Sequence, residues 1–188
     1  MKKKINNEEY PTAPGLIGNQ VYLRPTSPED FKITYQWFLT SDPFSQTSHQ
    51  IRLATPSQVV ERMRGKEATI NEGDFIIASV EDHRPLGKIR YFNLNMLNRS
   101  AELGYIVAPS ERQNGYAQEG LKLIIGFLFN QLNLNKVYAQ TATFNKPSIK
   151  LLESLDFKLD GTLRQHHFFK GDMYDDLVYS LLKFECSF

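Results

Sequence analysis

A short polar segment with one glycine stands between a strand-like stretch and the most regular helical pattern in the chain. A helix's first turn carries backbone N–H groups without partners and the positive end of the helix dipole, so a pyrophosphate can bind there with few cationic side chains. Gly115 permits close approach of the backbone, Ala117 keeps the turn open, and Arg112 can add a charged contact. The alternative is that the segment is an ordinary strand-to-helix turn with a capping glycine. The segment reads Arg112-Gln113-Asn114-Gly115-Tyr116-Ala117.

A second polar segment, Asn145-Lys146-Pro147-Ser148, follows the next strand-like stretch. Asn145 is a good helix N-cap, and Ser148 would then lie in the first turn. The sequence contains neither Gly-x-Gly-x-x-Gly nor Gly-x-x-x-x-Gly-Lys-Ser/Thr. These absences argue against a dinucleotide fold and against a nucleotide triphosphate loop.

Two other groups of polar residues are assigned no chemistry. His166 and His167 are neighbours on an expected strand, so their side chains point to opposite faces and cannot ligate one ion. We therefore expect no metal site. Asp172, Asp175 and Asp176 lie around an expected hairpin turn, where carboxylates are usually solvated.

The elements before the glycine segment are read from alternation and capping residues. Residues 21–24 alternate as a short strand does, and Ser27 can cap a helix in which Asp30 completes a capping box. A second helix is expected over residues 55–68. Three strands of an antiparallel meander then follow, over residues 75–80, 87–94 and 101–107.

The elements after the glycine segment begin with a helix that places Leu121, Ile124, Ile125 and Leu128 on one stripe. A strand over 136–143, a helix from Asn145 to about 155, and a strand pair over 157–169 and 173–183 complete the chain. The expected order is β-α-α-β-β-β-α-β-α-β-β. This order predicts a mixed α/β fold with a central, mostly antiparallel sheet flanked by about four helices.

Composition limits which binding partners and which cellular compartment are expected. The 188 residues carry a net charge of +1, which gives no overall field for nucleic acid. No apolar run is long enough to span a membrane, and no signal peptide is visible. Cys186 is the only cysteine, so no intrachain disulfide can form and a cytoplasmic location is expected. We expect a polar arm over residues 1–15 and one domain over residues 16–188.

The motifs together resemble the acetyl-CoA motifs of GNAT N-acetyltransferases, and most of all the RimJ/RimL-like branch. The resemblance runs from about residue 21 to 183 and rests on the strand Ala101-Glu102-Leu103-Gly104-Tyr105-Ile106-Val107, on the segment from Arg112 to Gly120, on Asn145 to Ser148, and on Leu155-Asp156-Phe157. The sequence departs from the family at Asp156, where many relatives have glycine, and at Leu152, where many have a tyrosine that acts as an acid.

The resemblance implies an enzyme that uses acetyl-CoA as co-substrate and needs no metal. It places the pyrophosphate on residues 112–117, and the pantetheine arm and the oxyanion on backbone groups around Ile106 and Val107. It also places Asn145 and Ser148 against CoA or its thiol. Leu152 excludes the usual tyrosine acid, so Ser148 or a water molecule is left to assist the departing thiolate, whose pKa of about 8.5 makes it a stable leaving group.

An amine acceptor must lose its proton before it can attack a thioester. A lysine-like amine has a pKa of about 10.4, so only around one molecule in a thousand is neutral at pH 7. Glu102 matches a frequently acidic position of the branch and is the expected base, acting through water. The alternative is that Glu102 is an exposed strand carboxylate or an ion-pair partner.

Three functions are compatible with these residues. The first is acetylation of a primary amine of a small molecule such as a polyamine, an amino sugar or an antibiotic. The second is acetylation of a protein N-terminus, as in ribosomal-protein acetyltransferases, and the third is a non-catalytic acyl-CoA-binding module. Neither a nucleic acid nor a membrane is expected as partner, and the chain is expected to be a monomer or a homodimer.

Overall fold

The computed structural model describes residues 14–41, 55, 57–58, 61 and 71–188. The helix expected over residues 55–68 lies mostly outside these ranges, and so do residues 1–13 of the expected arm. All other expected elements are present within a residue or two, except for the start of the first helix. Their bounds are β1 (Val21–Pro25), α1 (Asp30–Thr40), β2 (Gly73–Ser79), β3 (Pro85–Asn95), β4 (Ser100–Val107), α3 (Tyr116–Asn130), β5 (Lys136–Ala142), α4 (Lys146–Glu153), β6 (Lys158–Phe169) and β7 (Asp172–Leu182).

The strands form one seven-stranded sheet in the order β1-β2-β3-β4-β5-β7-β6. Every neighbouring pair is antiparallel except β4 and β5, which are parallel because α3 connects them as a crossover. This confirms the expected mixed α/β class with a mostly antiparallel sheet and a central strand-helix-strand unit.

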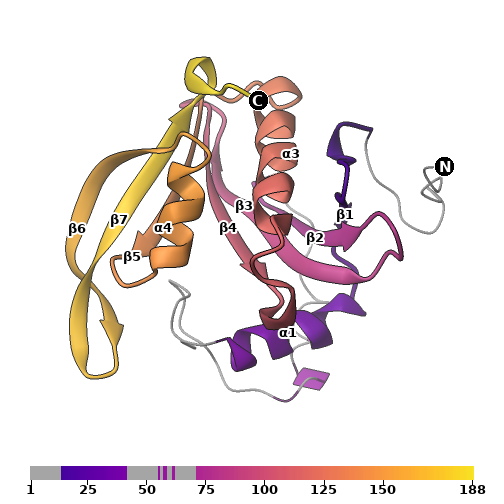
Figure 1. Ribbon diagram of the computed structural model, residues 1–188. Coiled ribbons are helices and arrows are strands. Elements are labelled where there is room, and N and C mark those ends of the chain that lie inside the picture. Colours follow the sequence, from indigo (N-terminus) through magenta and orange to yellow (C-terminus); the bar gives the residue numbers. More distant parts are fainter. Residues whose placement is uncertain (1–13, 42–54, 56, 59–60, 62–70) are drawn as a thin grey trace.

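The parallel pair β4 and β5 separates soon after it begins. Only Ser100, Ala101 and Glu102 of β4 have partners on β5, where Glu102 lies opposite Tyr138. Beyond this point β4 continues to Val107 beside β3, and β5 continues to Ala142 beside β7. Residues 103–107 and 139–142 therefore face each other across an opening in the middle of the sheet. Figure 1 shows the two strands diverging there.

The main core lies between the sheet and helices α3 and α4. The predicted stripe of α3 is fully buried: Leu121, Ile124, Ile125 and Leu128 have no exposed surface. The same cluster includes Leu152 of α4 and inward-facing residues of most strands. Helix α1 instead packs on the opposite face, where Trp37 contacts Ile106 and Ala108. In Figure 1, α1 lies near the end of β4 and the start of α3.

Helix α1 begins at Asp30, three residues after the expected cap. The backbone N–H of Ser27 donates to the Asp30 carboxylate at 2.8 Å, as in half of a capping box. The Ser27 hydroxyl donates to the same carboxylate at 2.9 Å. Asp30 also receives two 2.7 Å hydrogen bonds from Arg24, and this buried pair ties α1 to β1. The N-cap residue of α1 is Glu29 and not the expected Ser27.

The final hairpin turns at Lys170 and Gly171, whose φ angles are 49° and 95°. Two consecutive positive φ angles are typical of the two-residue turns that join twisted antiparallel strands. The expectation that Asp176 is solvated is wrong, because this carboxylate is 1% exposed. It accepts a 2.7 Å hydrogen bond from Gln140 and lies 3.4 Å from His167 Nδ1. Asp176 lies within β7, away from the turn, and is paired with β5 on one side and β6 on the other.

Candidate active site

The segment 112–117 forms an exposed loop that ends at the N-cap of α3. Gly115 is the N-cap residue with φ of 80°, and no side chain among the described residues caps the helix. Asn114 donates to the carbonyl of Glu111 at 3.2 Å, which closes the loop on itself. Arg112 donates to the Ser41 hydroxyl at 3.0 Å and so links the loop to the end of α1. The backbone N–H groups of the first turn of α3 are thus available to an anion.

The backbone at Gly115 is open on its Cβ side. A Cβ built on this glycine would meet no heavy atom within 4 Å, so the backbone is open on the side where a ligand would approach. Its positive φ is a conformation that side-chain-bearing residues adopt only at a cost. Gly115 therefore provides a left-handed turn and leaves the backbone open at the start of α3.

The first turn of α4 lies against the separated part of β4. The Asn145 side chain accepts from the backbone N–H of Ser148 at 3.3 Å, which confirms Asn145 as the N-cap of α4. The Ser148 hydroxyl lies 2.7 Å from the hydroxyl of Tyr105, a residue in the part of β4 that pairs with β3 but not with β5. Burial raises the pKa of Tyr105 to about 12. This phenol is consequently neutral at physiological pH and keeps its proton.

Glu102 occupies the last paired position before β4 and β5 separate. Its carboxylate accepts a 2.8 Å hydrogen bond from the side chain of Asn93. Burial and the negative charge of Glu102 raise the pKa of Tyr138, the residue directly opposite on β5. No salt bridge pairs Glu102 with a cation in the part of the chain that the structure describes. The carboxylate thus lies at the start of the opening with polar neighbours and no counter-ion.

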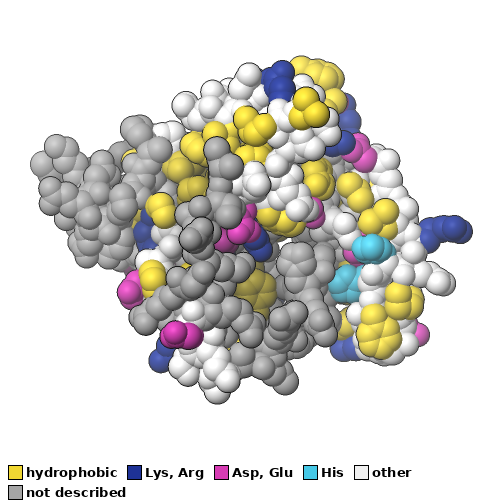
Figure 2. Space-filling model, turned by 180° about the vertical axis from the view of Figure 1, so that it is seen from behind, with side chains coloured by type: hydrophobic (Ala, Val, Ile, Leu, Met, Phe, Trp, Pro, Cys, Tyr) yellow, Lys and Arg dark blue, Asp and Glu magenta, His cyan; other side chains and the backbone are white. Residues whose placement is uncertain are grey.

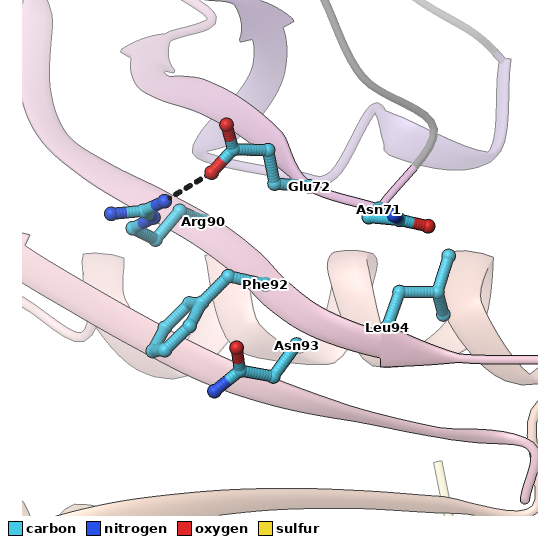
Figure 3. Close-up of a pocket in the computed structure, with 6 residues that line it drawn as sticks. All are labelled: Asn71, Glu72, Arg90, Phe92, Asn93 and Leu94. Carbon is cyan, nitrogen blue, oxygen red and sulfur yellow. Dashed lines mark hydrogen bonds and ion pairs between the residues drawn. The ribbon is translucent and has the colours of Figure 1, made fainter.

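A pocket of about 420 Å³ lies beside Glu102. It is lined by Asn71, Glu72, Arg90, Phe92, Asn93 and Leu94. Figure 3 shows Arg90 turned toward Glu72, with which it forms a 2.7 Å ion pair. The guanidinium of Arg90 also lies 4.7 Å from the centre of the Phe92 ring. Because Phe92 is the cross-strand partner of Glu102, the pocket and the carboxylate belong to one surface of the sheet.

This surface is the face of the sheet opposite α3 and α4. Figure 2 shows a hollow near its middle, with acidic side chains beside it and histidine side chains at its rim. Side chains alternate between faces along a strand, so Tyr105 points toward the helices while Glu102 points toward this hollowed face. The two polar groups of β4 therefore approach the opening from opposite sides of the sheet.

Ile106 and Val107 belong to the part of β4 that pairs with β3 but not with β5, and the side chain of Ile106 is buried against Trp37. Sequence spacing gave no sign of Tyr105, whose partner Ser148 is 43 residues away, or of Tyr138. The pairing of β4 with β5 brings Tyr138 opposite Glu102, and the packing of α4 brings Ser148 to Tyr105. Neither arrangement can be predicted from spacing along the sequence.

No group of three or more His, Cys, Asp or Glu side chains that could hold a metal ion occurs among the described residues. Within the same residues, every helix is too short or too polar to cross a bilayer.

Comparison with known proteins places the chain in a family. Residues 20–158 match the model of the acetyltransferase (GNAT) domain. The chain is 32% identical over 177 residues to the uncharacterized N-acetyltransferase p20 of Bacillus licheniformis, covering 90% of this chain and 97% of that protein. It is 30% identical over 90 residues to spermidine N(1)-acetyltransferase of Vibrio cholerae, covering 48% of this chain and 52% of that enzyme.

The fold is also that of a solved acetyltransferase structure. A crystal structure of spermidine N-acetyltransferase from Vibrio cholerae in complex with CoA and spermine superposes with a TM-score of 0.82 at 21% identity, covering 89% of this chain and 98% of that one. The expected GNAT fold is thereby confirmed. The chain belongs to the GNAT family and is an N-acetyltransferase that uses acetyl-CoA as its acetyl donor.

Proposed function

We propose that the enzyme acetylates a primary amine of a small cationic molecule, such as a polyamine, an amino sugar or an aminated antibiotic, by direct attack on acetyl-CoA. The observation that carries this proposal is Glu102, an acidic side chain without a cationic partner among the described residues, placed where β4 and β5 separate. The similarity to spermidine N(1)-acetyltransferases supports a small amine as acceptor.

In this proposal the exposed loop and the first turn of α3 hold the pyrophosphate. Arg112 and the backbone around Gly115 provide the contacts, and the N-terminal end of the helix dipole adds attraction. Around Ile106 and Val107, the edge of β4 that faces away from β3 offers the backbone N–H of Val107 to the pantetheine arm or to the oxygen that gains negative charge. Asn145 and Ser148 bound the same space from α4.

Glu102 removes the proton that the attacking amine must lose. It acts through a water molecule, and Asn93 and Tyr138 keep its carboxylate in position. Bound acetyl-CoA supplies a thioester, so that a carbon–nitrogen bond forms, the carbon–sulfur bond breaks and the electron pair leaves with sulfur. The released amine proton passes to Glu102 and then to solvent.

The pocket beside Glu102 sets the size of the acceptor. Its 420 Å³ suits a small molecule, and Phe92 offers an apolar surface over which an alkylamine can lie. The carboxylates of Glu72 and Glu102 lie on the same surface and favour a cationic ligand, although Glu72 is partly neutralised by Arg90. A polyamine, with several cationic groups on an apolar chain, fits this combination.

A panel of acceptors tests the proposal. The purified enzyme is incubated with acetyl-CoA and spermidine, an amino sugar, an aminoglycoside or a short peptide with a free alanine N-terminus, and each product is identified by mass spectrometry. We expect acetylation of at least one small amine at a kcat/KM well above that for the peptide. Acetylation of the peptide but of none of the small amines would instead support the protein N-terminal activity that the RimJ/RimL-like motifs predict.

A further inference from the structure

Polar side chains also lie across the opening from Glu102, on the side formed by β5, β7 and β6. Glu102 and its cross-strand partner Tyr138 point toward the hollowed face. Residues two apart on a strand share a face, so Gln140 and Ala142 of β5 point the same way, and so does Asp176, the partner of Ala142 on β7. The hollowed face thus carries a carboxylate on each side of the opening.

Asp176 is a buried carboxylate whose two oxygens are unequally satisfied. The residue is 1% exposed, and its Oδ2 accepts a 2.7 Å hydrogen bond from Gln140. Its Oδ1 has no hydrogen-bond partner among the described residues and lies 3.4 Å from Nδ1 of His167, which is a cation only when protonated. No lysine or arginine in the described part of the chain forms a salt bridge with Asp176. A buried charge is costly without a partner, so a positive charge on a ligand nearby would stabilise this carboxylate.

Two other carboxylates of the hollowed face are already neutralised by the chain itself. Asp74 lies 2.8 Å from the ammonium of Lys88, and Glu72 lies 2.7 Å from the guanidinium of Arg90. These pairs belong to β2 and β3 and to the residue just before β2, beyond β4. Uncompensated negative charge therefore remains on both sides of the opening, at Glu102 and across from it on β7.

Three half-buried aromatic rings surround His167 and continue the surface beside Asp176. The ring of Phe144, just after β5, lies 5.2 Å from the ring of His167, 4.5 Å from that of Phe169 and 5.0 Å from that of Tyr174, measured between ring centres. The faces of aromatic rings attract cations. The ammonium of Lys170 lies 5.2 Å from the centre of the Phe169 ring, so this cluster already accepts an alkylammonium from the chain.

We propose that Phe144 and Tyr174, beside the carboxylate of Asp176, bind a second ammonium group of the acceptor while its reacting amine lies next to Glu102. This inference rests on the proposed function and narrows the acceptor to molecules with at least two cationic nitrogens. Because Asp176 is buried, the ammonium contacts the aromatic rings and is attracted by the carboxylate without touching it.

The spacing of the two carboxylates calls for an extended acceptor. Their partners on β5, Tyr138 and Ala142, are four residues apart, which corresponds to about 13 Å along the strand. The pocket lined by Phe92 is on the Glu102 side, so the reacting end of the acceptor lies there and its chain crosses the opening. A flexible diamine or polyamine can reach both sides, whereas an amine with a single charge occupies only one.

A series of matched acceptors isolates the contribution of the second ammonium. Linear alkylamines and the terminal diamines of the same chain lengths are assayed with acetyl-CoA at pH 8.5, where alkylammonium groups are charged and free imidazole is neutral. The measured quantity is the diamine preference: kcat/KM of each diamine, divided by its number of reactive ends, relative to kcat/KM of the monoamine of equal length. Loss of stability or of general-base assistance lowers both values and cancels in this ratio.

We expect the wild type to prefer the longer diamines by about 10-fold or more and the shortest diamines little or not at all. Asp176→Asn should lower this preference by at least about 10-fold, the effect of one charge even at about 12 Å near a protein surface. Phe144→Leu should lower it by about 2- to 5-fold, and Phe144→Tyr should retain it, because an aromatic face is kept. Glu81→Gln, which removes an exposed carboxylate in the β2–β3 turn, should leave the preference unchanged.

Acetylation of monoamines and diamines without preference would overturn the second subsite while leaving the proposed function intact. A preference that falls in Glu72→Gln but not in Asp176→Asn would also overturn it, since the second ammonium would then lie in the pocket beside Glu102. If Asp176→Asn does not fold, Phe144→Leu and Phe144→Tyr decide the question.

Failure to acetylate any small amine would refute the proposed function, and calorimetric titration of a long diamine into the enzyme–CoA complex then judges the subsite alone. Binding that weakens by about 10-fold in Asp176→Asn would support the subsite. Absence of binding, or equal binding by the wild type and Asp176→Asn, would overturn it.

Discussion

Replacing Gly115 by glutamate should weaken the binding of CoA by about 30-fold or more without unfolding the enzyme. Gly115 has φ of 80° and open space where its Cβ would be, so the new Cβ meets no neighbour and carries the carboxylate to the surface on which the pyrophosphate is proposed to lie. The only intrinsic cost is the left-handed conformation, about 1 to 2 kcal/mol of folding free energy. For a chain of this length, such a cost lowers Tm by about 2 to 8 °C.

The effect on ligand binding should be larger and electrostatic. A carboxylate about 4 Å from one phosphate charge is repelled by about 1 kcal/mol in water and by about 4 kcal/mol at the effective dielectric constant of a protein surface. The loop is exposed, so an intermediate value of about 2 to 3 kcal/mol applies, and at about 1.4 kcal/mol per tenfold the affinity falls by about 30- to 140-fold. The second phosphate and the bulk of the side chain increase this loss.

Calorimetric titration of CoA distinguishes the effect of the new negative charge at position 115 from the effect of backbone strain at that position. Gly115→Gln has nearly the same size and backbone cost but no charge, so it should bind CoA distinctly better than Gly115→Glu. Gly171→Glu is matched in conformation, with φ of 95° and open space at the tip of the final hairpin, and should bind CoA like the wild type. Equal affinities for Gly115→Glu and the wild type would refute the placement of the pyrophosphate on this loop.

Two further predictions concern stability. Burial alone would raise the pKa of Asp30, but hydrogen bonds from Arg24 and Ser27 outweigh burial, so the pKa is lowered. The carboxylate therefore stabilises the fold at any pH above its unfolded pKa of about 3.8. This stabilisation is lost as the pH falls through the lower pKa of the folded state. Asp30→Asn should therefore destabilise the enzyme by about 3 kcal/mol at pH 7 in urea unfolding, with a difference from the wild type that shrinks below pH 4; a difference independent of pH would contradict this assignment. Asp176→Ala should cost about 2 to 3 kcal/mol because it leaves buried polar partners unsatisfied, whereas exposed Asp172→Ala should change stability by less than about 0.5 kcal/mol, and equal costs for both would show that burial of Asp176 is unimportant.

Local patterns predicted the elements well because each depended on neighbouring residues. The stripe of Leu121 to Leu128 is buried as its spacing indicated, and Asn145 caps α4 as its position before Pro147 suggested. Gly115 was identified for the same reason, since its sequence context and its place before a helix are both local properties. These features need no knowledge of how the sheet is assembled.

Features that depend on register could not be predicted in this way. Asp176 was expected to be solvated because it follows a turn, but the pairing of β7 with β5 and β6 buries it. Tyr105 is one of several aromatic residues on strands, and only the assembled fold shows that its hydroxyl meets Ser148. Ser27 is a residue type that often caps helices, but both its backbone N–H and its hydroxyl donate to the Asp30 carboxylate, which the sequence pattern alone does not predict.

The central claim is that Glu102 accepts the amine proton during acetyl transfer, and Glu102→Gln tests it most directly. With spermidine as acceptor, kcat/KM at pH 7 should fall by about 10²- to 10⁴-fold while the affinity for acetyl-CoA is unchanged, because general-base assistance is lost but the donor site is intact. The deficit should shrink as pH rises toward the amine pKa of about 10.4, where the acceptor is already neutral. Glu81→Gln, at an exposed position in the β2–β3 turn, serves as control. A kcat/KM for Glu102→Gln equal to that of the wild type at pH 7 would contradict the account.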